Sequence, residues 1–246
     1  MTFSPLTHAI AFGLILWFFI SAKKVDSSKK FGTTILLLSL SLILWVALST
    51  ALAVQDFYFQ KNAFFLPIVI FAILPVAGLM IAYIVSPSVK GLADLFIDHL
   101  PRGHLAAIHI ARVLAIGTIY KMFAGLLPAH FIVPTGIPDF IFGLSAIYVA
   151  WQAEQLSDRA FLVWNIVGLA IFGVALVTMQ LSLPGPLHVI NDGPTTREVV
   201  SFPMSLVPTF IAPFFITVHL VAIAKVLKGA NASVRRTGGP STVSLI

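Results

Sequence analysis

The sequence predicts an all-α, polytopic transmembrane helix bundle with about seven membrane-spanning helices. Of its 246 residues, 59% are hydrophobic and only 10% are charged, whereas an ordinary soluble domain carries roughly 25% charged residues. The chain has no cysteine, which excludes disulfides, thiolate zinc sites, iron–sulfur clusters and cysteine nucleophiles. The net charge of +6 comes from basic residues at the ends of apolar segments, a pattern that indicates membrane orientation and argues against a nucleic-acid partner.

Seven apolar segments, each near the roughly 20 residues that a helix needs to cross the hydrocarbon of a bilayer, follow one another along the chain. We expect the first to be retained, because it lacks the basic start and small-residue cleavage site of a signal peptide. The fifth is the shortest. Together they form a single transmembrane domain over residues 1–230, with predicted spans 5–22, 33–54, 64–85, 104–126, 138–153, 160–182 and 204–227.

The placement of Lys and Arg predicts an N-terminus outside and a cytoplasmic C-terminus. In this orientation eleven of the fifteen basic residues lie on the cytoplasmic side and two outside, as the positive-inside rule requires. The other two, Arg112 and Lys121, lie within the fourth helix. We therefore expect a multi-pass protein of the cell (inner) membrane.

Two segments on the cytoplasmic side differ from the spans. Residues 88–101 place apolar side chains on one side of a helix and charged ones on the other, which predicts an amphipathic helix in the membrane interface. Residues 231–246 are rich in Ser, Thr, Gly and Arg, and without apolar periodicity we expect them to form a flexible tail.

The fourth helix contains the stretch HIARVLAIGTIYK, residues 109–121. At 100° per residue, His109, Arg112 and Tyr120 fall within an arc of about 80°, and Lys121 lies about 100° beyond Tyr120. A charged residue at this depth costs at least ~2.5 kcal/mol, so we expect Arg112 to face the interior of the bundle.

Few protein partners are predicted for Arg112. Apart from backbone carbonyls, the nearby spans offer Asn165 and Gln180. Two interpretations remain open: an anionic ligand, which Arg binds bidentately through carboxylate or phosphate oxygens, or a structural tie to carbonyls that prolines free in the seventh helix.

Between the fourth and fifth helices, LLPAHFIVPTGIPD, residues 126–139, contains three prolines and a glycine. These residues predict a rigid non-helical connection at the outer face. Asp139 then falls in the first turn of the fifth helix. It is either a helix-start residue that accepts unpaired N–H groups or a functional carboxylate that faces Lys121 across the outer end of the site.

The pattern RVLAIGTIYKMFAGLLPAHFIVPTGIPDFIFGLSA, which begins at Arg112, resembles a group of uncharacterised bacterial polytopic inner-membrane proteins of about seven helices. The resemblance implies no activity.

The seventh helix carries three prolines at intervals of five residues, and such breaks open cavities between helices. Its His219 is either an internally hydrogen-bonded residue at a packing kink or part of a ligand site. Because His109 and His219 are predicted at similar depth, the pair also suggests ligation of a b-haem iron.

The segment 183–203 is longer than the topology needs, which is common for functional lids. Its polar residues could combine with others near the outer face to hold a metal, although no spacing fixes a geometry and a solvated loop is the simpler interpretation. The residues concerned are His188, Asp192 and Glu198 from the loop, with His8, His130 and Asp139.

We expect no catalytic residue and no metal site, and predict that the chain binds or transports a small anionic or amphiphilic ligand between the fourth, fifth and seventh helices. One alternative is an electron-transfer protein that carries b-haem or quinone, and another is an accessory subunit of a larger membrane complex or homo-oligomer. The predicted ligand-binding residues are His109, Arg112, Tyr120, Lys121, Asp139 and His219.

Overall fold

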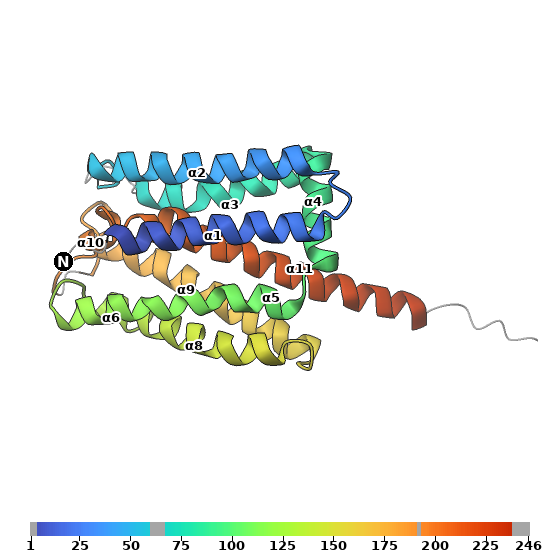
Figure 1. The fold of residues 1–246 in the computed structure, drawn as a ribbon. Helices are drawn as coiled ribbons and strands as arrows, with labels where there is room; N and C mark the ends of the chain where they lie inside the picture. Colours follow the sequence, from blue (N-terminus) through green and yellow to red (C-terminus); the bar gives the residue numbers. More distant parts are fainter. Residues whose placement is uncertain (1–3, 60–66, 191–192, 238–246) are drawn as a thin grey trace, which may run out of the picture.

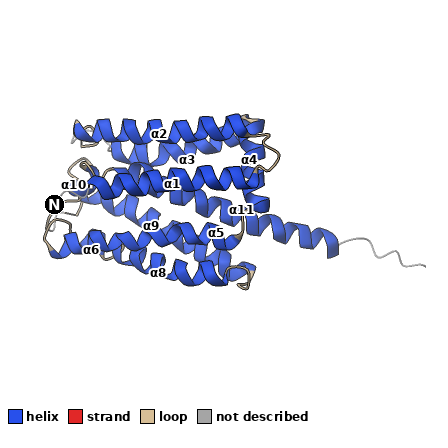
Figure 2. Ribbon diagram, in the orientation of Figure 1, coloured by secondary structure: helices blue, strands red, loops and turns tan. Residues whose placement is uncertain are grey.

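The computed structural model describes residues 4–59, 67–190 and 193–237. Within these ranges the chain is helical, with no strand (Figure 2). Seven segments are helical, long enough and apolar enough to cross a membrane, which confirms the predicted number. Their axes are roughly aligned, and one further helix, α4, lies across one end of the bundle (Figure 1). We call this the α4 end, and the opposite end, where α1 begins, the N-terminal end.

Several of the seven spans are composite, and the elements in chain order explain how. The first three spans are α1 (Ser4–Val25), α2 (Gly32–Val54) and α3 (Pro67–Val85), followed by α4 (Pro87–His99). The fourth span joins α5 (Arg102–Ala107), the 3₁₀-helix η1 (Ile108–Ala115) and α6 (Ile116–Phe123). The fifth joins α7 (Ala129–Ile132) and α8 (Gly136–Gln152), and the sixth is α9 (Asp158–Ser182). A short α10 (Arg197–Val200) precedes the π-helix η2 (Val207–Ile211) and α11 (Ala212–Thr237), which make the seventh.

The distribution of side chains on α2 is the reverse of that on a helix in water. Its buried positions include Ser39 and Ser49, while five leucines are more than two-fifths exposed. Exposed apolar surface of this extent is unusual for a soluble monomer and suits hydrocarbon. The exposed leucines are Leu36, Leu37, Leu40, Leu44 and Leu48.

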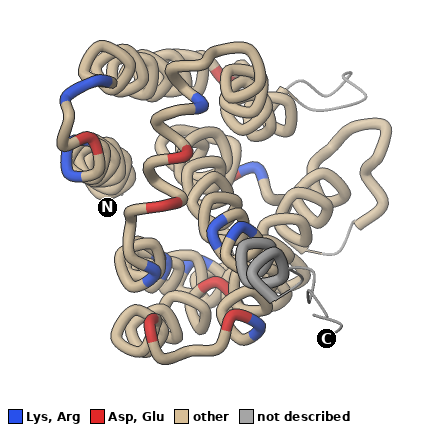
Figure 3. Tube along the Cα trace, turned by 90° about the vertical axis from the view of Figure 1, so that its right-hand side faces the viewer, with Lys and Arg blue, Asp and Glu red and all other residues tan. Residues whose placement is uncertain are grey.

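Helix α4 confirms the predicted amphipathic segment 88–101. Ser86 caps its N-terminus: the Ser86 side chain accepts a hydrogen bond from the Val89 N–H at 3.4 Å, a common N-cap arrangement. Leu92 and Phe96 are buried against the bundle. On its polar side, Asp98 accepts a hydrogen bond from Lys228 at 2.6 Å. Figure 3 views the molecule from this end.

The fifth span begins nine residues earlier than predicted, at Ala129 in place of Pro138. Pro128 has the extended backbone of an N-cap, and the buried side chains of Phe131 and Ile132 hold the short helix α7 against the bundle. The prediction of a non-helical connection over 126–139 was therefore wrong in part: residues 126–128 and 133–135 are non-helical, but 129–132 and 136–139 are helical, because a proline at a helix start does not interrupt the helix.

The C-terminal helix also extends further than predicted. Helix α11 continues through Thr237, so residues 231–237 of the expected flexible tail are helical. Extension of an existing helix is much easier than nucleation, and the Ala and Arg residues in this stretch favour it. Residues 238–246, like the predicted start of the third span at Phe64, lie outside the described part of the chain.

Candidate functional site: a buried ion pair at the end of an apolar cavity

Arg112 lies midway through the bundle, as the eleventh of the 22 residues in its span, with a side chain only 1% exposed. It belongs to the 3₁₀-helix η1, in which side chains three positions apart are eclipsed. This geometry places His109 and Arg112 on the same side, and both are buried. Tyr120 in α6 is 65% exposed, so the structure does not bring it into the interior together with His109 and Arg112. A wheel at 100° per residue does not describe the tighter η1.

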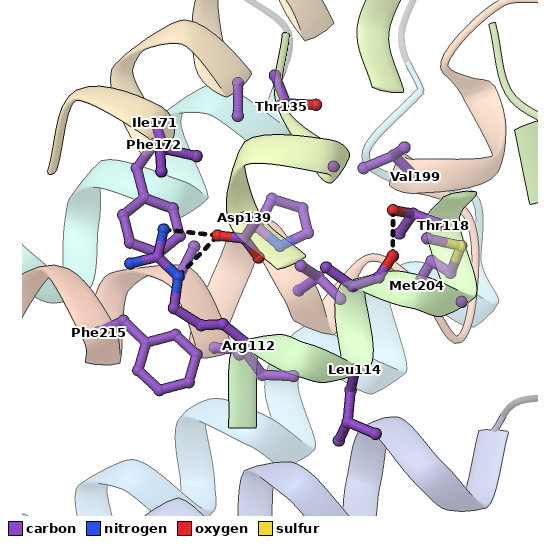
Figure 4. A pocket seen from close by; sticks show the side chains of 18 of the residues that line it. Arg112, Leu114, Thr118, Thr135, Asp139, Ile171, Phe172, Val199, Met204 and Phe215 are labelled. Carbon is purple, nitrogen blue, oxygen red and sulfur yellow. Dashed lines mark hydrogen bonds and ion pairs between the residues drawn. The ribbon is translucent and has the colours of Figure 1, made fainter. Parts of the chain in front are cut away.

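The partner of Arg112 is Asp139. The guanidinium donates from Nε to Asp139 Oδ1 at 2.7 Å, and its Nη2 lies 2.6 Å from the same oxygen, as Figure 4 shows. Asp139 is the eleventh of 24 residues in its span and therefore also lies at mid-depth. Asp139 lies in the first turn of α8, as predicted, but at mid-depth and not at the outer end. Its ion pair is with Arg112, whereas Lys121 pairs with Glu198.

Close packing of α8 on η1 makes this ion pair possible. A Cβ on Gly143 would lie closer than 3.0 Å to the backbone of Arg112 and Val113, so the two helix backbones are in contact there. Asp139 precedes Gly143 by one helical turn, and this turn brings its carboxylate level with the guanidinium.

Four further groups surround the guanidinium. Arg112 Nη1 lies 3.1 Å from His219 Nε2, and Nη2 donates to the Gly168 carbonyl at 3.4 Å. The rings of Phe142 and Phe172 lie with centroids 4.1 and 4.4 Å from Cζ, within the range of cation–π attraction. Arg112 is thus a structural tie among the fourth, fifth, sixth and seventh spans, and the predicted shortage of protein anions around it was wrong.

The predicted tie between Arg112 and a carbonyl freed by proline takes a different form. Pro213 cannot donate a hydrogen bond to the carbonyl of Thr209 four residues earlier. That carbonyl accepts a hydrogen bond from Trp45 Nε1 at 2.8 Å. The carbonyl left without its helical donor by Pro213 is therefore hydrogen-bonded by a side chain of α2. Arg112 instead contacts the His219 side chain on the seventh span.

Hydrogen bonds determine the tautomer of His219. A guanidinium only donates, so Nε2 of His219 must accept from Arg112 and the ring proton must be on Nδ1. Nδ1 then donates to Asn165 Oδ1 at 2.8 Å, and the Asn165 amide donates to the Phe161 carbonyl. His219 is therefore held neutral, in the way expected for an internally hydrogen-bonded histidine.

His109 stacks on His219 with ring centroids 4.0 Å apart and an interplanar angle of 17°. It is fully buried, and neither of its ring nitrogens has a hydrogen-bond partner among the described residues. The two histidines do not fit a shared haem iron. Both nitrogens of His219 are already engaged, and rings in face-to-face contact leave no space for a porphyrin between them.

The ion pair forms one end of a cavity of about 210 Å³ that extends toward the N-terminal end of the bundle. Walls come from α1 and from the third to seventh spans, more elements than the three helices predicted. Apart from six polar or charged side chains, its lining is aliphatic, aromatic, Met, Pro and Gly. The six are Thr7, Arg112, Thr118, Lys121, Thr135 and Asp139.

A profile of the family described as Domain of unknown function (DUF8737) matches residues 63–227, 165 of the 246 residues. The chain belongs to the DUF8737 family. The match takes in the whole ion-pair network from His109 to His219, together with Glu198, and leaves α1 and α2 outside. Comparison with curated proteins and with solved structures found no match.

At the N-terminal end of the cavity, the DUF8737 domain has a second ion pair. Lys121, which lines the cavity, pairs with Glu198 of α10. Val199 and Val200 beside it are buried, and Val199 also lines the cavity. Helix α10, within the segment 183–203, therefore packs at this end of the cavity. Lys121 contributes to the lining from a position remote from Arg112.

The polar residues considered as metal ligands are dispersed. His8 lies 3.2 Å from the Thr50 hydroxyl and His130 lies 2.8 Å from that of Ser182. Among the described residues no three His, Asp or Glu side chains gather as a metal site would require. Asp192 lies outside those residues.

Glycine was the signal that the sequence interpretation missed in the DUF8737 domain. A Cβ on Gly168 would lie closer than 3.0 Å to the ring of His219 and to Phe142, so the network closes only around a glycine. Small residues often mark close helix contacts in membranes. The sequence does not say which helix approaches, and so neither Gly168 nor Gly143 could be assigned a role in advance.

Proposed function

We propose that this protein binds a small amphiphilic molecule in the cavity, with the polar end of the molecule at the Arg112–Asp139 pair. The observation that supports this proposal most strongly is the combination of apolar walls with one buried ion pair at the end of the cavity. Ligand sites commonly have this composition, a mostly apolar lining with a few convergent polar groups. Ionisable residues at mid-depth of a membrane are also costly, and they usually serve a function.

The same geometry removes the main support for an anionic ligand. Arg112 already has a carboxylate, an imidazole, a carbonyl and two aromatic faces around it. An anion would have to displace Asp139 from a charge-assisted hydrogen bond. The amphiphilic part of the expectation is retained, because it depends on the apolar walls.

We also propose that the protein resides in a cell (inner) membrane with its N-terminal end outside and its α4 end cytoplasmic. The eleven-to-two distribution of basic residues supports this orientation. A C-terminal reporter active only in the cytoplasm is then expected to work, and one active only outside is expected to fail. The opposite pattern would reverse the orientation.

The test of ligand binding uses three radiolabelled single-chain probes that differ only in the head group: dodecanol, dodecanoate and dodecylammonium. The protein is studied in phosphatidylcholine nanodiscs, with empty nanodiscs subtracted. Gly117 lines the cavity, and a Cβ built on it meets nothing within 4 Å, so Gly117→Leu places a side chain in the cavity. The matched control is Gly173→Leu, at an exposed glycine of α9 that also faces open space.

Saturable binding of at least one probe to the wild type and to Gly173→Leu, with a loss of about tenfold or more in Gly117→Leu, is the expected result. Equal binding by both variants, or no saturable binding of any probe, would refute the cavity as a ligand site. That result would favour the third expectation, an accessory subunit with no ligand of its own.

A further inference from the structure

The chemistry of the cavity also indicates which amphiphile fits and how it arrives, provided that the proposed ligand binding holds. Both contacts of Arg112 with Asp139 use the same oxygen, Oδ1. Among the described residues no hydrogen bond reaches Oδ2. This atom is also not one of the fully buried polar atoms that lack a partner, so it is not enclosed by protein. The Asp139 side chain remains 24% exposed and lines the cavity. Oδ2 is therefore an accessible acceptor.

A carboxylate oxygen accepts hydrogen bonds and does not donate them. The head group that satisfies Oδ2 must therefore carry a donor. A carboxylate or phosphate head would place like charges together, and a quinone head has acceptors alone. Two threonines of the lining, Thr118 and Thr135, do not supply this donor. Their hydroxyls already donate to the carbonyls of Ala115 and Phe131.

The charges around the cavity favour a neutral head group over a cationic one. Each positive side chain of the lining is matched by a carboxylate, Arg112 by Asp139 and Lys121 by Glu198. An ammonium group would add one uncompensated charge at a depth where a charge is costly. A hydroxyl supplies a donor without adding a charge.

Two exposed residues of the lining indicate where the cavity approaches the surface of the bundle. Of all the lining residues, only Leu6 on α1 and Leu114 on η1 are exposed, at 41% and 42%. Helix α1 packs mainly on α2, α4 and η2. Its contacts with the fourth span include Trp17 and Ser21 against His104 of α5, on the α4 side of the cavity. The cavity therefore reaches the outer surface of the bundle between α1 and the fourth span, where the neighbouring surface is apolar and faces hydrocarbon in a bilayer.

We propose that the ligand is an uncharged, hydroxyl-bearing membrane amphiphile that enters sideways from the bilayer between α1 and the fourth span and donates its hydroxyl to Asp139 Oδ2. Arg112 acts as a positioning residue, because it holds Oδ1 and thereby directs Oδ2 into the cavity. The apolar walls hold the chain of the amphiphile.

Head-group selectivity tests the first half of this proposal with the wild-type protein. Dodecanol is expected to bind about tenfold or more tightly than dodecanoate, which has no donor for Oδ2. It is expected to exceed dodecylammonium by a similar factor, because the added charge of the ammonium is costly at this depth. In the double variant Arg112→Met/Asp139→Leu, which replaces the pair by apolar groups of similar size, dodecanol is expected to lose about the same factor. Equal binding of all three probes to the wild type would overturn the assigned head group.

Binding kinetics test the second half. Leu114→Trp narrows the proposed opening, and Leu144→Trp is the control, at a leucine 45% exposed on α8 that does not line the cavity. We expect Leu114→Trp to slow both association and dissociation of dodecanol severalfold while the Kd stays near that of the wild type. Unchanged rates in Leu114→Trp would refute lateral access.

The outcomes separate this inference from the proposed function. If dodecanoate or dodecylammonium binds as tightly as dodecanol and Gly117→Leu blocks all of them, the cavity is a ligand site and the hydroxyl assignment is wrong. If Gly117→Leu has no effect on any probe, the ligand site itself is wrong.

Discussion

Removing the negative charge of Asp139 is the most informative single perturbation of the site. Asp139→Asn keeps the shape of the side chain and removes the counter-charge of a guanidinium that is 1% exposed. The remaining contacts of Arg112 are the His219 ring, the Gly168 carbonyl and two aromatic faces. None of these carries a formal negative charge, so the variant leaves a buried charge uncompensated.

Burial determines the size of the expected effect. Removing one member of a buried ion pair costs about 3–5 kcal/mol, whereas an exposed pair contributes about 0–1 kcal/mol. The control is Glu198→Gln, which breaks the Lys121 pair in the same chemical way at a carboxylate that is 39% exposed. We therefore expect Asp139→Asn to lower the free energy of unfolding by about 3–5 kcal/mol and Glu198→Gln by about 1 kcal/mol or less.

The assay is reversible unfolding in mixed micelles by titration with a denaturing detergent, followed by far-ultraviolet circular dichroism. The double variant Arg112→Met/Asp139→Leu completes the comparison, because replacing a whole buried pair by apolar groups is often neutral. It is expected to recover most of the stability that Asp139→Asn loses. Equal losses for Asp139→Asn and Glu198→Gln, or a double variant less stable than Asp139→Asn, would refute the described pairing.

Three further predictions concern other parts of the fold. Gly168→Ala is expected to cost at least about 1–3 kcal/mol by overpacking, because its Cβ would meet the His219 ring, whereas Gly173→Ala, at an open position, is expected to be neutral or slightly stabilising in the same detergent titration. Ser86→Ala removes the N-cap of α4 and is expected to cost about 1 kcal/mol, measurable as faster amide hydrogen exchange in the first turn of that helix; unchanged exchange would contradict the capping role. Burial raises the pKa of Tyr58, between α2 and α3, above its ordinary value of 10.0, so the folded state holds the phenolic proton more tightly than the unfolded state. The contribution of Tyr58 to the free energy of unfolding is therefore constant up to about pH 10 and falls as pH rises through the folded pKa. Tyr58→Phe is expected to abolish this fall.

Hydropathy was sufficient to predict the number of spans and the amphipathic helix α4. Both depend on composition and periodicity, which a single sequence contains in full. The interior position of Arg112 was equally predictable, because the cost of a charge in hydrocarbon allows few alternatives. His219 was also identified from the sequence, as a histidine in a span that prolines interrupt, and the structure places its ring beside Arg112.

The partner of Arg112 could not be predicted, for two physical reasons. The prolines of residues 126–139 were interpreted as a surface connection, although those at 128 and 138 lie at helix starts and allow the chain to descend to mid-depth before Asp139. In addition, η1 turns by about 20° more per residue than an α-helix, so a wheel drawn at 100° misplaced Tyr120. Neither the 3₁₀ segment nor the contact at Gly143 has a distinctive local pattern.

An experimental structure of the protein with terminally brominated dodecanol would test the central claim most directly. The account predicts the bromine signal among the apolar side chains of the cavity, with the hydroxyl at hydrogen-bonding distance from Asp139 Oδ2 while Oδ1 remains paired with Arg112. A bromine signal confined to the outer surface of the bundle, with the cavity closed or filled by protein side chains, would contradict it.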